Sequence, residues 1–113
     1  MIICDIDGVS GSAQALTIAT SSTNGAAYGA AGTVSVALSA GANTISGAVH
    51  IYNIGGTTQN QVAQGVLVQD SGADKSVTSV LCPTNTAAVV NAIRFAWTSG
   101  SFDAGTIRVY GVK

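Results

Sequence analysis

Apolar and polar residues alternate in short runs along the chain, which is typical of β-strands rather than of helices. The runs are rich in Val, Ile and Thr, whereas Glu is absent, Leu is scarce and Gly interrupts every window that could form a helix. The alternation predicts strands over residues 2–6, 15–19, 33–38, 48–53, 61–69, 76–82, 92–98 and 106–112. Without helices to connect parallel strands, we expect an all-β, mainly antiparallel fold, a β-sandwich or jelly roll of about eight strands.

The same alternation predicts which side chains point into the core. In the last two strands these are Ile93, Phe95, Trp97, Ile107 and Val109. Arg108 and Tyr110 should point outward. Residues 99–105 are rich in Gly and Ser and should join the two strands as a hairpin loop, and Pro83 should end the strand before them because proline cannot donate to a ladder.

Residues 20–32 interrupt the pattern of strands. They are almost all Ala, Gly, Ser and Thr, with Asn24 and one aromatic residue, Tyr28. Small side chains of this kind lack the apolar volume to nucleate a core. We expect either a surface loop or an arm that becomes ordered on a partner, with Asn24 and Tyr28 in contact with that partner.

Length and charge limit the classes of function. The chain has 113 residues, enough for one hydrophobic core, so we expect a single domain over residues 1–113. Four Lys or Arg against five Asp give a net charge of -1. So few basic side chains cannot neutralise several phosphates, which argues against nucleic-acid binding. No apolar run approaches the roughly 18 residues that would span a bilayer, and the first residues lack the basic leader of a signal peptide.

Small side chains also make the expected domain marginally stable. Ala, Gly, Ser and Thr make up about half of the residues, so little apolar surface is buried per residue. Sheet edges with almost no Lys or Glu discourage pairing with neighbours only weakly. We therefore expect a subunit of a homo-oligomer. Cys4 and Cys82 are either joined in a disulfide or are two buried free thiols.

Asp5 and Asp7 are the strongest candidates for catalysis. Residues 2–9, Ile-Ile-Cys-Asp-Ile-Asp-Gly-Val, resemble the first motif of haloacid-dehalogenase-type phosphatases, which implies Asp5 as nucleophile and Asp7 as general acid and base. The spacing also suits calcium, although the remaining ligands of an EF-hand loop are absent. The alternative is a first strand that ends in an Asp-X-Asp-Gly turn. Because the sequence around Asp5 and Asp7 does not provide the other elements of a phosphatase or calcium site, it predicts no enzyme, no metal site and no cofactor.

The remaining candidates are aromatic. His50 lies between Val49 and Ile51 in a predicted strand, so we expect a structural histidine rather than a zinc ligand or part of a catalytic triad. Tyr52 and Tyr110 are candidate contacts for a partner protein. Together with Tyr28 they are also candidates for a platform on which a sugar stacks, whereas Trp97 is predicted to point inward.

The last 22 residues of the chain contain a pattern that is similar to one in known proteins. Residues 92–113 contain Ile-Arg-Phe, a Ser-Gly loop and then Gly-Thr-Ile-Arg-Val-Tyr-Gly. This ending resembles the carboxyl-terminal hairpin of small β-sandwich proteins of tailed bacteriophages. The resemblance implies a virion structural protein, either a capsid cement (decoration) protein or a receptor- or glycan-binding module of a tail fibre or tail tip.

A single domain that begins at Met1 and has no fibrous repeats favours the cement protein. The resemblance then implies a homo-oligomer, a trimer, that is assembled in the host cytoplasm and binds the major capsid protein on the capsid exterior. Such a protein stabilises the shell because it binds assembled capsid but not free coat protein. The expected contact residues are Asn24, Tyr28, Tyr52 and Tyr110.

Overall fold

The computed structural model describes residues 1–11, 15–21, 25, 34–37, 44–59, 61–70, 75–83, 89–97 and 101–113. These segments form β-strands, turns and extended chain, and no helix occurs among them. The strands are β1 (Ile2–Gly11), β2 (Ala15–Ser21), β3 (Val34–Ala37), β4 (Thr44–Tyr52), β5 (Val62–Asp70), β6 (Lys75–Pro83), β7 (Ala92–Trp97) and β8 (Phe102–Gly111). The described residues include no helix that is long and apolar enough to cross a membrane.

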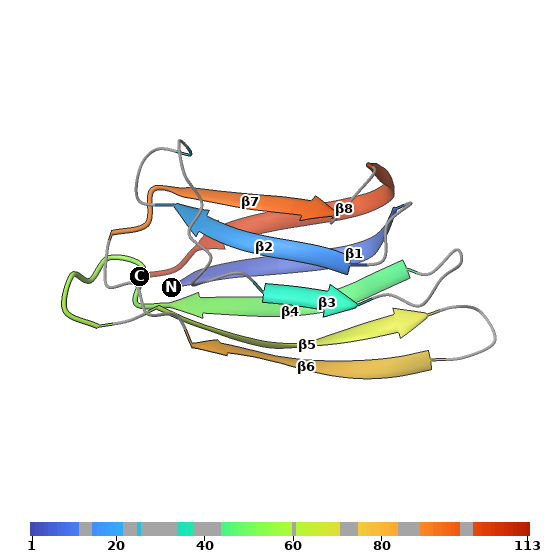
Figure 1. Cartoon of the computed structure of the whole chain (residues 1–113), viewed down its shortest axis with the longest axis horizontal. Helices are drawn as coiled ribbons and strands as arrows, with labels where there is room; N and C mark the ends of the chain where they lie inside the picture. Colours follow the sequence, from blue (N-terminus) through green and yellow to red (C-terminus); the bar gives the residue numbers. More distant parts are fainter. Residues whose placement is uncertain are drawn as a thin grey trace.

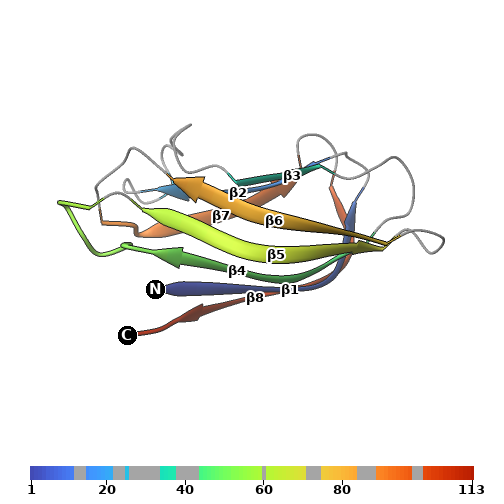
Figure 2. The same ribbon diagram turned by 90° about the horizontal axis from the view of Figure 1, so that it is seen from below.

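The strands form two antiparallel sheets that pack face to face, as Figure 1 and Figure 2 show. The wider sheet has the order β6-β5-β4-β1-β8 and the narrower sheet the order β3-β2-β7. The predicted all-β class and antiparallel pairing are therefore confirmed. β6 ends at Pro83, as expected for a residue that cannot donate a backbone hydrogen bond.

β1 continues to Gly11, so the prediction that the first strand ends in an Asp-X-Asp-Gly turn is wrong. Gly8 adopts a left-handed φ of 59° and forms a bulge, which inserts one extra residue opposite β4. Its N–H donates to Ser46 Oγ at 2.9 Å, so the distortion leaves this donor satisfied. The strand bends at this point instead of reversing.

β8 bends together with β1, toward the narrower sheet (Figure 2). Gly105 has a φ of 101° and lies directly against the backbone of Gly8 and Val9, where a side chain would find no room. The predicted hairpin over residues 99–105 is wrong. β8 already begins at Phe102 and pairs with β1, whereas β7 pairs with β2 in the other sheet, so the connection passes from one sheet to the other.

The core between the sheets consists almost only of aliphatic side chains. Its buried members are Cys4, Ile6, Val9, Leu16, Ile18, Ile45, Val49, Ile51, Ala63, Leu67 and Trp97. Trp97 is 6% exposed, and Ile93, Phe95 and Ile107 pack against the cluster, so the inward prediction is confirmed for these four. Val109 is the exception, with 45% of its surface exposed. β8 is the edge strand of the wider sheet, and the narrower sheet does not cover its second half.

A Cys4–Cys82 disulfide does not fit the topology. Cys4 lies in β1 and Cys82 in β6, and β4 and β5 separate these strands. Three strand spacings amount to about 14 Å, about twice the longest separation of α-carbons that a disulfide spans. Cys4 is a free, fully buried thiol, and burial raises its pKa from 9.0 to about 11. The Cys82 side chain lies outside the described residues.

The raised pKa of Cys4 predicts a loss of stability at alkaline pH. Between pH 9.0 and about 11 the unfolded chain loses the thiol proton and the folded chain keeps it. This difference lowers the free energy of unfolding by about 1.4 kcal/mol per pH unit, whereas below that range the thiol is protonated in both states. Urea denaturation of the wild type and of Cys4→Ala across this range should show the steeper decline in the wild type. Parallel declines would contradict the burial of Cys4.

Candidate binding surface

One face of the wider sheet points away from the narrower sheet, and we call it the outer face. Its described side chains include Ile3, Asp5, Ala48, His50, Tyr52, Gln64, Val66, Val68, Val77, Arg108 and Tyr110. Strand register places Tyr110, Ile3 and His50 in one row across β8, β1 and β4. The outward prediction for Arg108 and Tyr110 is confirmed, since both alternate with the inward-facing Ile107.

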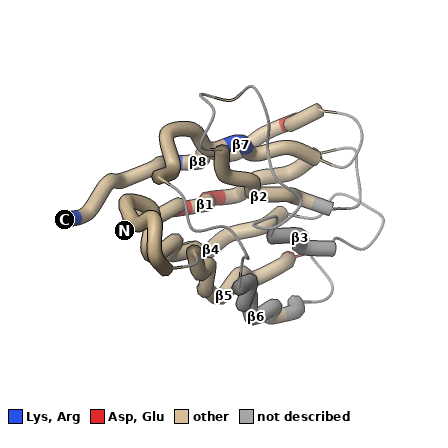
Figure 3. The backbone as a smooth tube through the Cα atoms, turned by 60° about the vertical axis from the view of Figure 1, so that its left-hand side comes forward, with Lys and Arg blue, Asp and Glu red and all other residues tan. Residues whose placement is uncertain are grey.

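Charge on the outer face lies on β1 and β8 and at the end of β5. Besides Asp5 and Arg108, the face carries the exposed Asp7 and, at the last position of β5, Asp70. Arg108 Nη1 donates to Asp5 Oδ2 at 3.4 Å, and both side chains are about half exposed. Such an exposed ion pair contributes only about 0–1 kcal/mol to stability. Because the positive charge of Arg108 lies beside the negative charge of Asp5, the pair adds no net charge to the outer face. Figure 3 shows that charged positions are few and scattered over the described backbone.

Three exposed valines form an aliphatic patch on β5 and β6. Val66 is 52% exposed and Val77 is 68% exposed, and Val68 lies opposite Val77 in the ladder. Single exposed valines are ordinary, but adjacent ones on a flat sheet favour contact with another surface. This patch was not predicted from the sequence. Its signal is the run Val66-Leu67-Val68, which places apolar side chains on both faces of one strand.

Two of the predicted partner-binding residues lie on the outer face. Tyr52 is half-buried in β4, and its ring centroid lies 6.3 Å from that of His50. Gln64 Nε2 donates to the Tyr52 hydroxyl at 3.4 Å. Tyr110, on the edge strand β8, is 49% exposed. The structure therefore brings Tyr52 and Tyr110 onto one face, together with the strand histidine.

The other two predicted partner-binding residues, Asn24 and Tyr28, lie outside the described residues. The predicted loop over residues 20–32 starts too early, because Thr20 and Ser21 are buried members of β2. Within that segment the structure also describes Gly25, whose N–H donates to Ser21 Oγ at 3.2 Å.

The candidate catalytic residues are not accompanied, among the described residues, by the further side chains that a catalytic or metal site would need. Asp5 and Asp7 lie two positions apart on β1, and Asp5 is paired with Arg108. No group of three or more His, Cys, Asp or Glu in the described segments could hold a metal ion. A haloacid-dehalogenase-type site requires a parallel sheet flanked by helices, which the antiparallel strands described above do not provide.

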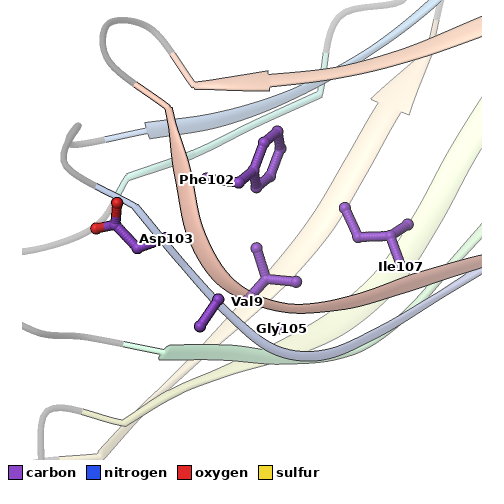
Figure 4. Close-up of a pocket in the computed structure, with 6 residues that line it drawn as sticks. Val9, Phe102, Asp103, Gly105 and Ile107 are labelled. Carbon is purple, nitrogen blue, oxygen red and sulfur yellow. The ribbon is translucent and has the colours of Figure 1, made fainter.

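The edge strand β8 adds a second feature. No strand among the described residues pairs with its outer side, and its residues are exposed except for the half-buried Ile107. An open pocket of about 400 Å³ lies at its first half, lined by Val9, Phe102, Asp103, Ala104, Gly105 and Ile107 (Figure 4). The Phe102 ring lies 5.7 Å from the Trp97 ring, which connects the pocket to the core. This pocket was not predicted from the sequence, because the Gly- and Ser-rich residues 99–105 are typical of a loop.

Comparison with known proteins identifies no family for this chain. No family model matches it, and neither a curated protein nor a solved structure does. The function therefore has to be inferred from the surfaces that the two sheets present.

Proposed function

We propose that this protein is a bacteriophage virion structural protein, a capsid cement protein that binds the outer surface of the shell and stabilises it. The observation that supports this function best is the outer face of the wider sheet. Its middle is neutral and presents Ala48, Val66 and Val68. The half-buried Tyr52 ring, the exposed Tyr110 ring and the charged side chains lie around this middle. Such a face can pack on a flat protein surface with little cost for removing charges from water.

Strand connectivity supports the finer assignment of the fold. β1 pairs with β8, β2 with β7 and β4 with β5, while β3 lies close to β6. These pairs form a ribbon folded on itself, and we propose an eight-stranded jelly-roll variant in which β4, β5 and β6 extend the wider sheet. Jelly rolls are frequent in viral capsid domains, so the fold adds support by analogy.

The proposed mechanism is thermodynamic and involves no enzymatic step and no cofactor. The partner is the major capsid protein in its assembled form, and the protein acts as a homo-oligomer on the capsid exterior. A ligand that binds only the assembled shell stabilises it by about 2.7 kcal/mol when its concentration is 100 times its dissociation constant. Many copies on one shell multiply this effect.

Binding to shells can be tested by co-sedimentation with expanded empty capsids of the phage that encodes the chain. We expect the wild type to pellet with the shells and to raise their melting temperature. Val66→Glu should weaken binding about tenfold or more, because a charge would have to be buried in the contact. The matched control is Val89→Glu, at 50% exposure outside the outer face, and it should bind like the wild type. Failure of the wild type to pellet, or equal binding by both variants, would contradict the proposal.

A second candidate is a glycan-binding module of a phage tail. The observation that favours it is the shared face of Tyr52, His50 and Tyr110, with the Gln64 amide at the Tyr52 hydroxyl. Aromatic rings beside polar groups can stack on sugars. This candidate predicts binding to host polysaccharide that Tyr110→Ala abolishes, with no binding to empty capsids.

A further inference from the structure

The two edges of the wider sheet differ in how well they are protected. β6 begins with Lys75 and ends with Pro83, and β3 of the narrower sheet lies close to it. Lys, Pro and a covering strand are the devices that keep an edge from pairing with another chain. Among the described residues, none of these devices lies along the outer side of β8. Its one basic residue, Arg108, is engaged by Asp5 of the neighbouring strand.

The two halves of β8 are complementary to each other. The first half carries the open pocket and the carboxylate of Asp103. The second half and the residues after it carry the exposed apolar side chains of Val109, Tyr110 and Val112 and the positive charge of Lys113. A second β8 that runs antiparallel would place its apolar, basic half along the hollow, acidic half of the first. Parallel pairing would place the two pockets side by side and the two apolar, basic halves side by side.

We propose that two copies of this chain pair antiparallel along β8, so that their wider sheets form one continuous sheet across a twofold axis. Backbone hydrogen bonds along the edge provide affinity, and the pocket that accepts an apolar side chain provides register. The contact is isologous, because each copy contributes the same surface. It produces a dimer in place of the trimer that the sequence resemblance implies, and it also joins two outer faces into one binding surface.

Sedimentation equilibrium of the purified full chain tests this pairing. We expect the wild type to have the mass of two copies, and Val109→Lys to raise the dissociation constant of the dimer about tenfold or more. A lysine at this position would bring positive charge to the edge and block its approach to a second copy. The matched control is Val89→Lys, outside the strands and outside the outer face, where the side chain is 50% exposed, and it should associate like the wild type. Circular dichroism shows whether each variant is folded.

A cross-link provides a second readout that does not depend on the lysine variant. Thr106 is exposed near the middle of β8, where an antiparallel pair brings each strand against its own copy. Under an added oxidant Thr106→Cys should form a covalent dimer, whereas the control Thr57→Cys, an exposed position outside the strands, should not.

Several results would overturn the pairing. They are a wild-type mass of one copy or of three copies, undiminished association of folded Val109→Lys, or equal cross-linking of the two cysteine variants. The inference rests on the proposed function because it names the strand through which the proposed homo-oligomer forms. Co-sedimentation with shells is a separate assay, so a protein that binds capsids without forming dimers would refute the pairing alone.

Discussion

Replacing Trp97 by alanine is expected to lower the free energy of unfolding by about 3–5 kcal/mol. Trp97 is the largest side chain of the core, lies against Gly11 and faces the Phe102 ring. Its Nε1 has no hydrogen-bond partner among the described residues, so the loss comes from packing. Because a small domain is stable by only about 5–15 kcal/mol, this single change removes a large part of the total.

Urea denaturation followed by circular dichroism measures this effect, since the chain has no other tryptophan to report by fluorescence. Trp97→Phe is the control, because it keeps an aromatic ring and should cost less than the alanine variant. Phe102→Ala should also cost less, because Phe102 is half-exposed at the pocket. A loss below about 1 kcal/mol for Trp97→Ala would be typical of a surface position and would contradict the placement of Trp97 in the core.

Gly105→Ala is expected to destabilise the protein by about 2–4 kcal/mol and to loosen β8. The positive φ of Gly105 is strained for any other residue, at about 1–3 kcal/mol, and the new methyl group would collide with the Val9 backbone. The collision can be relieved only if β8 moves away from the bulge in β1. Both the pocket and the free edge would then lose their shape.

Thermal unfolding tests this prediction, since each kcal/mol shifts the melting temperature of a domain of this size by roughly 4–8 °C. Gly111→Ala is the matched control in the same strand, because nothing lies near the space that its methyl group would occupy. It should stay within about 0.5 kcal/mol of the wild type. Equal melting temperatures for the two variants would show that Gly105 is not held against β1.

The strands were predictable because each depends on local alternation. Ile93, Phe95 and Trp97 follow a period of two, and in the structure Trp97 is buried while Ile93 and Phe95 are partly buried against the core, as expected. The bend in β1 was not predictable in this way, because Gly8 suits a turn as well as a bulge and only pairing with two neighbouring strands decides between them. Sheet membership is also non-local, which explains why β7 and β8 were wrongly paired as a hairpin.

The candidate surface was only partly predictable for a related reason. Alternation separates Tyr110 from Ile107, but it does not reveal which face a second sheet covers. The Val66 and Val77 positions therefore look like ordinary strand residues until the outer face is known to be open. The pocket at Phe102 depends on the shared bend of β1 and β8, which arises from pairing between the two ends of the chain.

Electron cryomicroscopy of the intact phage particle would locate the protein directly. If it is a cement protein, density that fits the two-sheet fold should cover the outside of the capsid, with the outer face of the wider sheet against the major capsid protein. Density confined to the tail, or a particle that lacks this chain, would contradict that function.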